Sequence, residues 1–184
     1  MFRGGDSFMT PEFARNHYDL LGLPLGYAVD LARLEQRYRE LQSQVHPDRF
    51  AAGSDAERRV AMQWATRANE AYRTLRDPVG RARYLLSLKG FDTGEETNTS
   101  MPPDFLMQQM EWREAVAGAA AARDTARLDA LRADIAAVRR DMIVVLGRAI
   151  DTDSNYAAGC SLVRKLRFLE KLEEEIDSAL EELR

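Results

Sequence analysis

His46, Pro47 and Asp48 place an imidazole and a carboxylate two residues apart, and this arrangement has three possible uses. A histidine hydrogen-bonded to an aspartate can serve as base and orienting group in a hydrolase, but no nucleophile motif, glycine-rich phosphate loop or metal cluster accompanies the pair. The proline can instead end a helix while Asp48 caps a turn. The tripeptide can also be an exposed docking loop. We expect that the chain is not an enzyme, and the other two uses remain open for the tripeptide alone.

Composition narrows the class of protein. The 184 residues are 45% hydrophobic and 30% charged, which is enough for a packed core beneath a highly charged surface. A formal net charge of −4 excludes a chain-wide basic field for nucleic acid. One cysteine and two histidines argue against a disulfide or a metal site, so we expect no metal and no cofactor. No apolar run approaches the roughly 20 residues that span a bilayer. Residues 1–6 lack the apolar core of a secretory signal, and we expect a cytoplasmic protein.

The elements that must position the tripeptide are helices. Residues 1–10 are glycine-rich and polar and are expected to be disordered. A first helix is predicted over residues 11–21. Asp30 can cap a second helix, which Pro47 stops because proline disfavours helical geometry at His46. The apolar face of this second helix recurs at three- and four-residue steps and comprises Leu31, Leu34, Tyr38, Leu41 and Val45.

A third helix is predicted over residues 55–75, with residues 46–54 as the loop before it. Its apolar face comprises Val60, Trp64, Ala68, Ala71, Tyr72 and Leu75. Two amphipathic helices joined by a short polar loop form an antiparallel hairpin, with the tripeptide at its turn. Pro78 opens a shorter helix over residues 79–89, which Gly90 ends.

Several motifs in this region occur together and in order. Residues 18–23 read Tyr-Asp-Leu-Leu-Gly-Leu, the tripeptide follows the basic second helix, and residues 69–75 read Asn-Glu-Ala-Tyr-Arg-Thr-Leu before Asp77 and Pro78. Over residues 16–78 the sequence resembles the J-domain family, the co-chaperones of DnaK-type heat-shock ATPases. The resemblance implies that the chain regulates an ATPase by docking the tripeptide on it.

The resemblance also implies roles for individual residues. Asp48 can offer a charge-assisted hydrogen bond to an arginine of the ATPase, and Pro47 restricts the loop so that docking loses little entropy. His46 can hold the loop geometry through a ring nitrogen. Three arginines of the second helix can steer the chain toward an acidic partner surface: Arg33, Arg37 and Arg39. The alternative for these arginines is a solvated helix face, and it remains open.

The pattern changes after a boundary. Residues 91–103 contain glycine, asparagine, serine and two prolines, a composition typical of a linker. Apolar residues then recur four and three apart, first at Leu128, Leu131, Ile135, Val138, Met142, Val145 and Ala149, and again at Leu162, Leu166, Leu169, Ile176, Leu180 and Leu183. Together with residues 105–122 they predict an antiparallel three-helix bundle. The expected fold is all-α, with a helical hairpin domain over residues 11–78, a connecting helix and linker over 79–103, and the bundle over 104–184.

The first helix of the bundle has two apolar sides. At 100° per residue, Trp112, Val116 and Ala119 fall within about 40° of Phe105 and form one core stripe. Leu106, Met107 and Met110 lie between about 100° and 200°, on the other side, with Glu114 among them and Glu111 beside them. Phe168 lies about 100° from the core stripe of the last helix. These side chains either contact a partner, or Leu106 or Met107 packs on the hairpin domain and Phe168 widens the core.

Three segments connect the bundle with a narrower family. Residues 81–91, 105–114 and 163–172 resemble HscB-type J-proteins of bacterial iron–sulfur cluster assembly, and the resemblance extends from Asn16 to nearly the end of the chain. It implies two partners, an HscA-like chaperone ATPase and an IscU-like cluster scaffold protein. Three helices of matching length with short connections favour a bundle within one chain, so we expect a monomer, with no membrane and no nucleic acid as partner. The implied scaffold-binding residues are Leu106, Met107, Met110, Glu111, Glu114 and Phe168. The alternative is a general J-domain co-chaperone whose helical appendage binds a different client.

Overall fold

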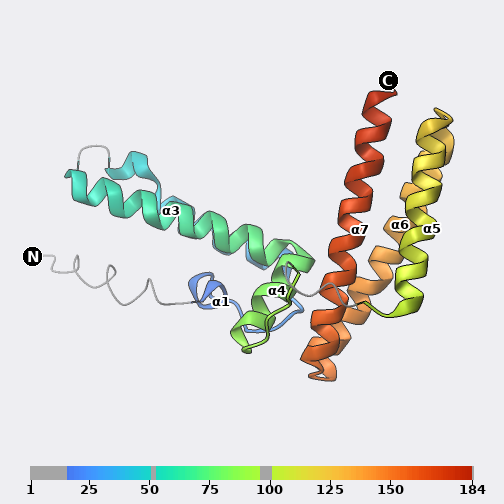
Figure 1. Ribbon diagram of the computed structural model, residues 1–184. Coiled ribbons are helices and arrows are strands. Elements are labelled where there is room, and N and C mark those ends of the chain that lie inside the picture. Colours follow the sequence, from blue (N-terminus) through green and yellow to red (C-terminus); the bar gives the residue numbers. More distant parts are fainter. Residues whose placement is uncertain (1–15, 51–52, 96–100, 184) are drawn as a thin grey trace, which may run out of the picture. The chain divides into compact units, whose positions relative to one another are not determined.

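The computed structural model describes residues 16–50, 53–95 and 101–183, and all regular structure within these ranges is helical. The elements are α1 (His17–Leu20), α2 (Leu31–Val45), the 3-10 helix η2 (Pro47–Phe50), α3 (Asp55–Arg76), α4 (Pro78–Leu88), α5 (Pro103–Ala121), α6 (Thr125–Gly147), the π-helical turn η3 (Arg148–Thr152) and α7 (Tyr156–Glu182) (Figure 1). The predicted all-α fold is confirmed. No helix in the described part of the chain has the length and apolarity needed to cross a membrane.

The chain divides into two compact units, and the division lies inside α4. Unit 1 ends at Arg81 and unit 2 begins at Ala82. Unit 1 contains α1, α2, η2 and α3, whereas unit 2 contains α5, α6, η3 and α7. The tripeptide therefore belongs to unit 1, and the second apolar side of α5, with Leu106, Met107 and Met110, belongs to unit 2.

The ends of α2 and α3 follow from their capping residues. The Asp30 carboxylate accepts hydrogen bonds from the amides of Ala32 and Arg33 at 3.0 and 3.1 Å, which satisfies free donors of the first turn of α2. At the other end His46 is extended, as expected of a residue before proline. α3 begins with a capping box in which Ser54 Oγ accepts from the Glu57 amide and the Glu57 side chain accepts from the Ser54 amide.

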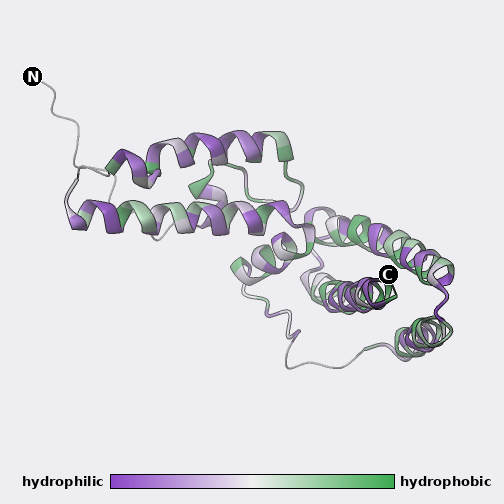
Figure 2. Ribbon diagram, turned by 90° about the horizontal axis from the view of Figure 1, so that it is seen from above, coloured by the Kyte–Doolittle hydropathy of each residue, from purple (hydrophilic) through white to green (hydrophobic). Residues whose placement is uncertain are grey.

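The hairpin core forms where α2 and α3 pack together, with α1 against α3. Leu34 of α2 is buried, as are Trp64, Ala68 and Leu75 of α3. Hydrophobic and hydrophilic segments alternate along both helices (Figure 2). Leu31, which was predicted to share this face, is exposed because it lies in the first turn of α2 at the open end of the hairpin.

Two expectations at the N-terminal side need amendment. The loop predicted over residues 46–54 contains the 3-10 helix η2, closed by a hydrogen bond from the Arg49 amide to the His46 carbonyl at 3.0 Å. Of the helix predicted over residues 11–21, the structure describes α1 (His17–Leu20) with its cap Asn16. Residues 1–10, predicted to be disordered, lie outside the described residues.

In unit 2, α5, α6 and α7 run side by side and pack on one another (Figure 1). Their shared core contains Val116, Ala119, Leu128, Leu131, Ile135, Leu169, Leu172, Ile176 and Leu180. Val145 was predicted to continue the stripe of α6, but it is 53% exposed and Leu146 is buried instead. The reason is geometric: 18 residues complete five turns of an α-helix, so Leu146 lies directly in line with Leu128, whereas strict seven-residue spacing drifts about 20° per heptad.

Polar contacts hold the chain after α4 against α7. The Glu95 carboxylate accepts two hydrogen bonds from the Arg83 guanidinium, at 2.5 and 2.6 Å, and a third from Thr93 Oγ1 at 2.8 Å. Arg164 of α7 donates to the Thr93 carbonyl at 2.8 Å. The first part of the segment predicted as a linker is therefore anchored within unit 2. Cys160 is buried near the start of α7, and burial raises the pKa of its thiol.

Candidate functional site

The tripeptide presents its carboxylate to solvent. The side chain of Asp48 is 89% exposed, so its oxygens remain open to a partner's guanidinium. The His46 ring lies over the turn, where Nδ1 accepts a hydrogen bond from the Asp48 amide at 3.3 Å and lies 3.5 Å from the Asp48 carboxylate. These two contacts hold the ring against the turn, while the Asp48 carboxylate remains largely exposed.

A neighbouring arginine ties this turn to α2. Arg49 Nη1 donates to the Ser43 carbonyl at 2.9 Å, which satisfies one of the acceptors that the last turn of a helix leaves open. The Arg49 amide bonds to the His46 carbonyl in the same turn. Both contacts were missed from the sequence, where nothing about an arginine after the tripeptide indicates which carbonyl it reaches.

The three arginines predicted to steer docking do not form one patch. Arg33 and Arg37 lie about 40° apart around α2, but Arg39 lies about 160° from Arg37, on the other side of the helix. Arg37 pairs with Glu40 at 3.1 Å, and Arg39 pairs with Glu35. Hydrogen bonds from Gln36 and from Arg37 lower the pKa of Glu40. Among the described residues Arg33 has no such partner.

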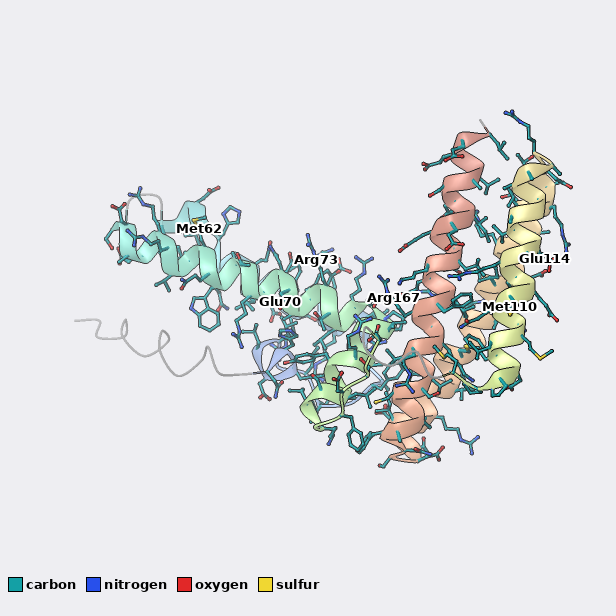
Figure 3. All side chains as sticks on the ribbon, viewed as in Figure 1. Met62, Glu70, Arg73, Met110, Glu114 and Arg167 are labelled. Carbon is teal, nitrogen blue, oxygen red and sulfur yellow. The ribbon has the colours of Figure 1, made fainter. Side chains whose placement is uncertain are left out.

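The second side of α5 is exposed, as the helical wheel predicts. The exposed fractions are 42% for Leu106, 64% for Met107 and 72% for Met110. Glu111 and Glu114 are also exposed and form no ion pair within the described part of the chain. Figure 3 shows Met110 and Glu114 projecting from α5. We call these five residues the α5 face.

Phe168 lies at the margin between the α5 face and the bundle core. Its ring is half-buried and makes an edge-to-face contact with Phe105, with ring centroids 6.0 Å apart. The Arg113 guanidinium lies 5.2 Å from the centroid of Phe168, and Lys165 Nζ lies 5.0 Å from that of Phe105. Phe168 thus packs on the core and keeps part of its surface exposed. The helical wheel did not predict Arg113 as a neighbour of Phe168 or Lys165 as a neighbour of Phe105.

Comparisons with known proteins identify both units. Residues 16–84 match the family model described as the DnaJ domain, and residues 101–177 match the one described as the HSCB C-terminal oligomerisation domain. The chain is 55% identical over 168 residues to the co-chaperone protein HscB homolog of Burkholderia vietnamiensis, which covers 91% of this chain and 95% of that protein. The corresponding protein of Paraburkholderia xenovorans is 52% identical over 168 residues, which again cover 91% of this chain and 95% of that protein.

Solved structures agree with these matches. The chaperone HscB from Vibrio cholerae superimposes with a TM-score of 0.80 at 36% identity, covering 92% of this chain and all of that one. The human co-chaperone protein HscB superimposes with a TM-score of 0.86 at 28% identity, covering 96% of this chain and 91% of that one. With both units matched and an identity above one half across nearly the full length, the chain belongs to the HscB family of J-domain co-chaperones.

Proposed function

We propose that this chain stimulates the ATPase of a specialised DnaK-type chaperone of the HscA type and delivers to it a cluster scaffold protein of the IscU type. In this account it aids the maturation and transfer of iron–sulfur clusters. The observation that carries the proposal is the pairing, in one chain of this family, of the exposed His46 and Asp48 side chains on unit 1 with an exposed apolar face on unit 2. The cluster belongs to the scaffold as its cargo.

The tripeptide acts on the ATPase. The exposed Asp48 carboxylate accepts a bidentate hydrogen bond from an arginine of the chaperone, an interaction about twice as strong as one between neutral groups. Because His46 and Arg49 already hold the turn, docking costs little further ordering. Arg33, which is not paired within the described chain, adds steering toward an acidic surface, whereas the ion pairs of Arg37 and Arg39 reduce their contribution.

The α5 face binds the scaffold. Leu106, Met107 and Met110 supply adaptable apolar area, and methionines suit a surface that must conform to a partner. Glu111 and Glu114 frame them with negative charge, so the matching scaffold surface is apolar with basic groups at its edge. Phe168 adds an aromatic anchor whose ring is held by Phe105.

The proposal is tested by the ATP turnover of the purified chaperone with and without this chain. Asp48→Asn is expected to abolish stimulation while leaving the melting temperature unchanged, because the side chain is almost fully exposed. Asp141→Asn, at an exposed position of α6, is the matched control and should stimulate as the wild type does. Full stimulation by Asp48→Asn would remove the tripeptide from the mechanism.

Scaffold binding is tested separately by calorimetry. Leu106→Ala, Met107→Ala and Met110→Ala are combined in one variant, which spares Phe168 because that ring also packs on the core. Its affinity for the scaffold is expected to fall on the order of 100-fold, since a few central apolar residues carry most of the energy of such interfaces. Val144→Ala with Val145→Ala, at exposed valines of α6, is the control. An unchanged affinity in the triple variant would show that the client binds elsewhere.

A further inference from the structure

Unit 1 carries a groove of about 580 Å³ that neither proposed surface uses. It lies between α2 and the C-terminal half of α3, and it continues to the start of α4. Its lining residues are Tyr38, Gln42, Asn69, Tyr72, Arg73, Arg76, Asp77 and Pro78. These side chains can contact a partner through aromatic surface, amide hydrogen bonds and positive charge.

Four of the lining residues are joined by ring stacking and side-chain hydrogen bonds. The rings of Tyr38 and Tyr72 stack with centroids 4.2 Å apart. Tyr38 Oη donates to Asn69 Oδ1 at 2.6 Å, while Gln42 Nε2 donates to Tyr38 Oη at 2.7 Å and to Asn69 Oδ1 at 2.8 Å. Among the described residues this leaves the Gln42 carbonyl and the Asn69 amide N–H groups unused. One acceptor and one donor side by side match the N–H and C=O of an extended peptide.

The rim of the groove is positively charged. Arg73 and Arg76 are exposed and have no carboxylate partner in the described part of the chain, and the Arg76 guanidinium lies 5.7 Å from the centroid of Tyr72. Figure 3 labels Arg73 on α3. The Asp77 carboxylate is engaged, because it accepts the Gly80 amide at 2.5 Å in the first turn of α4. Two guanidiniums without a carboxylate partner in the described chain, one of them over the Tyr72 ring, favour an acidic occupant.

The groove is also close to the tripeptide along α2. Gln42 precedes His46 by four residues, which is about one helical turn or 6 Å. A partner docked on the tripeptide therefore has the near end of the groove within reach. The far end, at Arg73 and Arg76, lies toward the start of α4.

We propose that this groove binds an extended acidic segment of the same chaperone ATPase that docks on the tripeptide, an inference that rests on the proposed function. Arg73 and Arg76 pair with carboxylates of the segment, while Gln42 and Asn69 hold its backbone. Because exposed charges chiefly raise the rate of association, the groove sets the concentration of this chain needed for stimulation, and Asp48 sets its maximum.

The test compares ATPase titrations of the wild-type chain and of an Arg73→Gln/Arg76→Gln variant at low and at high salt. At low salt we expect about a tenfold rise in the half-maximal concentration with an unchanged maximum, and a smaller difference at high salt, where screening weakens exposed pairs. Arg127→Gln/Arg140→Gln, at exposed arginines of α6, is the control with equal charge change and should titrate as the wild type does. A groove variant that matches this control overturns the inference, and a loss equal at both salts overturns the acidic chemistry.

A second measurement needs no variant. The side-chain amide signals of Gln42 and Asn69, followed by NMR, should shift when the ATPase domain of the chaperone is added, and signals that stay in place overturn the inference. Asp48→Asn separates the two proposals. If it stimulates fully, the proposed function fails whatever the groove does. If it does not stimulate while Arg73→Gln/Arg76→Gln titrates normally, the groove inference alone fails.

Discussion

The His46 and Asp48 side chains of unit 1 and the α5 face of unit 2 are both exposed, but they are supported differently. His46 and Asp48 stand on a turn held by hydrogen bonds to nearby backbone, and neither side chain packs in a core. The α5 face lies on a regular helix whose opposite side, at Phe105, is buried beside Phe168. Substitution of Asp48 is therefore expected to leave the free energy of unfolding unchanged, whereas Phe105 and Phe168, which support the α5 face, also pack in the bundle.

The largest difference between the two regions is expected beneath the α5 face. Phe105→Ala removes a buried ring that contacts Trp112 and Phe168, and it should lower the free energy of unfolding by about 3–4 kcal/mol. Scaffold affinity should fall as well, since Phe168 loses its support. Thermal unfolding of the full chain measures the first effect and calorimetry the second.

Met110→Ala is the matched comparison on the same helix. Its side chain is exposed, so the free energy of unfolding should change by less than about 0.5 kcal/mol while scaffold affinity falls. If Met110→Ala destabilised the chain as much as Phe105→Ala, the α5 face would be part of the core and the comparison would fail.

A smaller effect is expected next to the tripeptide. Ser54→Ala removes the cap whose Oγ accepts the Glu57 amide at 3.3 Å, and it should lower the free energy of unfolding by about 1 kcal/mol. The maximal ATPase stimulation should not change, because no described contact of His46 or Asp48 involves Ser54. Denaturant unfolding and the ATPase titration check the two halves of this prediction. A loss of maximal stimulation would mean that the turn depends on the start of α3.

An effect of similar size, which disappears at low pH, is expected at Glu95, whose hydrogen bonds anchor the chain after α4. Burial acts to raise the pKa of Glu95, but hydrogen bonds from Arg83 and Thr93, with the charges of Arg83 and Arg167, outweigh it and lower that pKa below its usual 4.5. The ionised carboxylate therefore stabilises the fold above the ordinary pKa, and this contribution is lost as the pH falls through the lower folded-state value.

Glu95→Gln should accordingly cost about 1 kcal/mol at pH 7 and progressively less below about pH 4.5. Urea unfolding at several pH values measures it, with Glu174→Gln at an exposed position of α7 as the control. A cost that persists unchanged under acid conditions would assign the stabilisation to packing rather than to the charge.

The sequence predicted the features that depend on neighbouring residues. Asp30 and Pro47 correctly predicted where α2 begins and ends. Helical spacing correctly distinguished the buried Phe105 from the exposed Met107 and Met110. The prediction that Val145 lies on the buried stripe was wrong, because a seven-residue repeat does not follow a straight helix of 3.6 residues per turn over the length of α6.

The features that the sequence did not predict depend on residues that only folding brings together. Tyr38 and Asn69 are 31 residues apart, and the groove that they share exists only once α2 and α3 are paired. The hydrogen bond from Arg164 to Thr93 joins residues 71 apart. The ion pair of Arg39 with Glu35 lies at a spacing of four residues, but the sequence does not decide between it and a free cation.

Delivery of the scaffold is expected to require both surfaces on one molecule. Chaperone ATPase turnover in the presence of scaffold tests this most directly, comparing the wild-type chain with an equimolar mixture of Asp48→Asn and the Leu106/Met107/Met110 triple alanine variant. If delivery requires both surfaces on one chain, the mixture stimulates no more than the triple variant alone at the same concentration. Restoration of wild-type turnover by the mixture would contradict the account, since each surface would then act without the other.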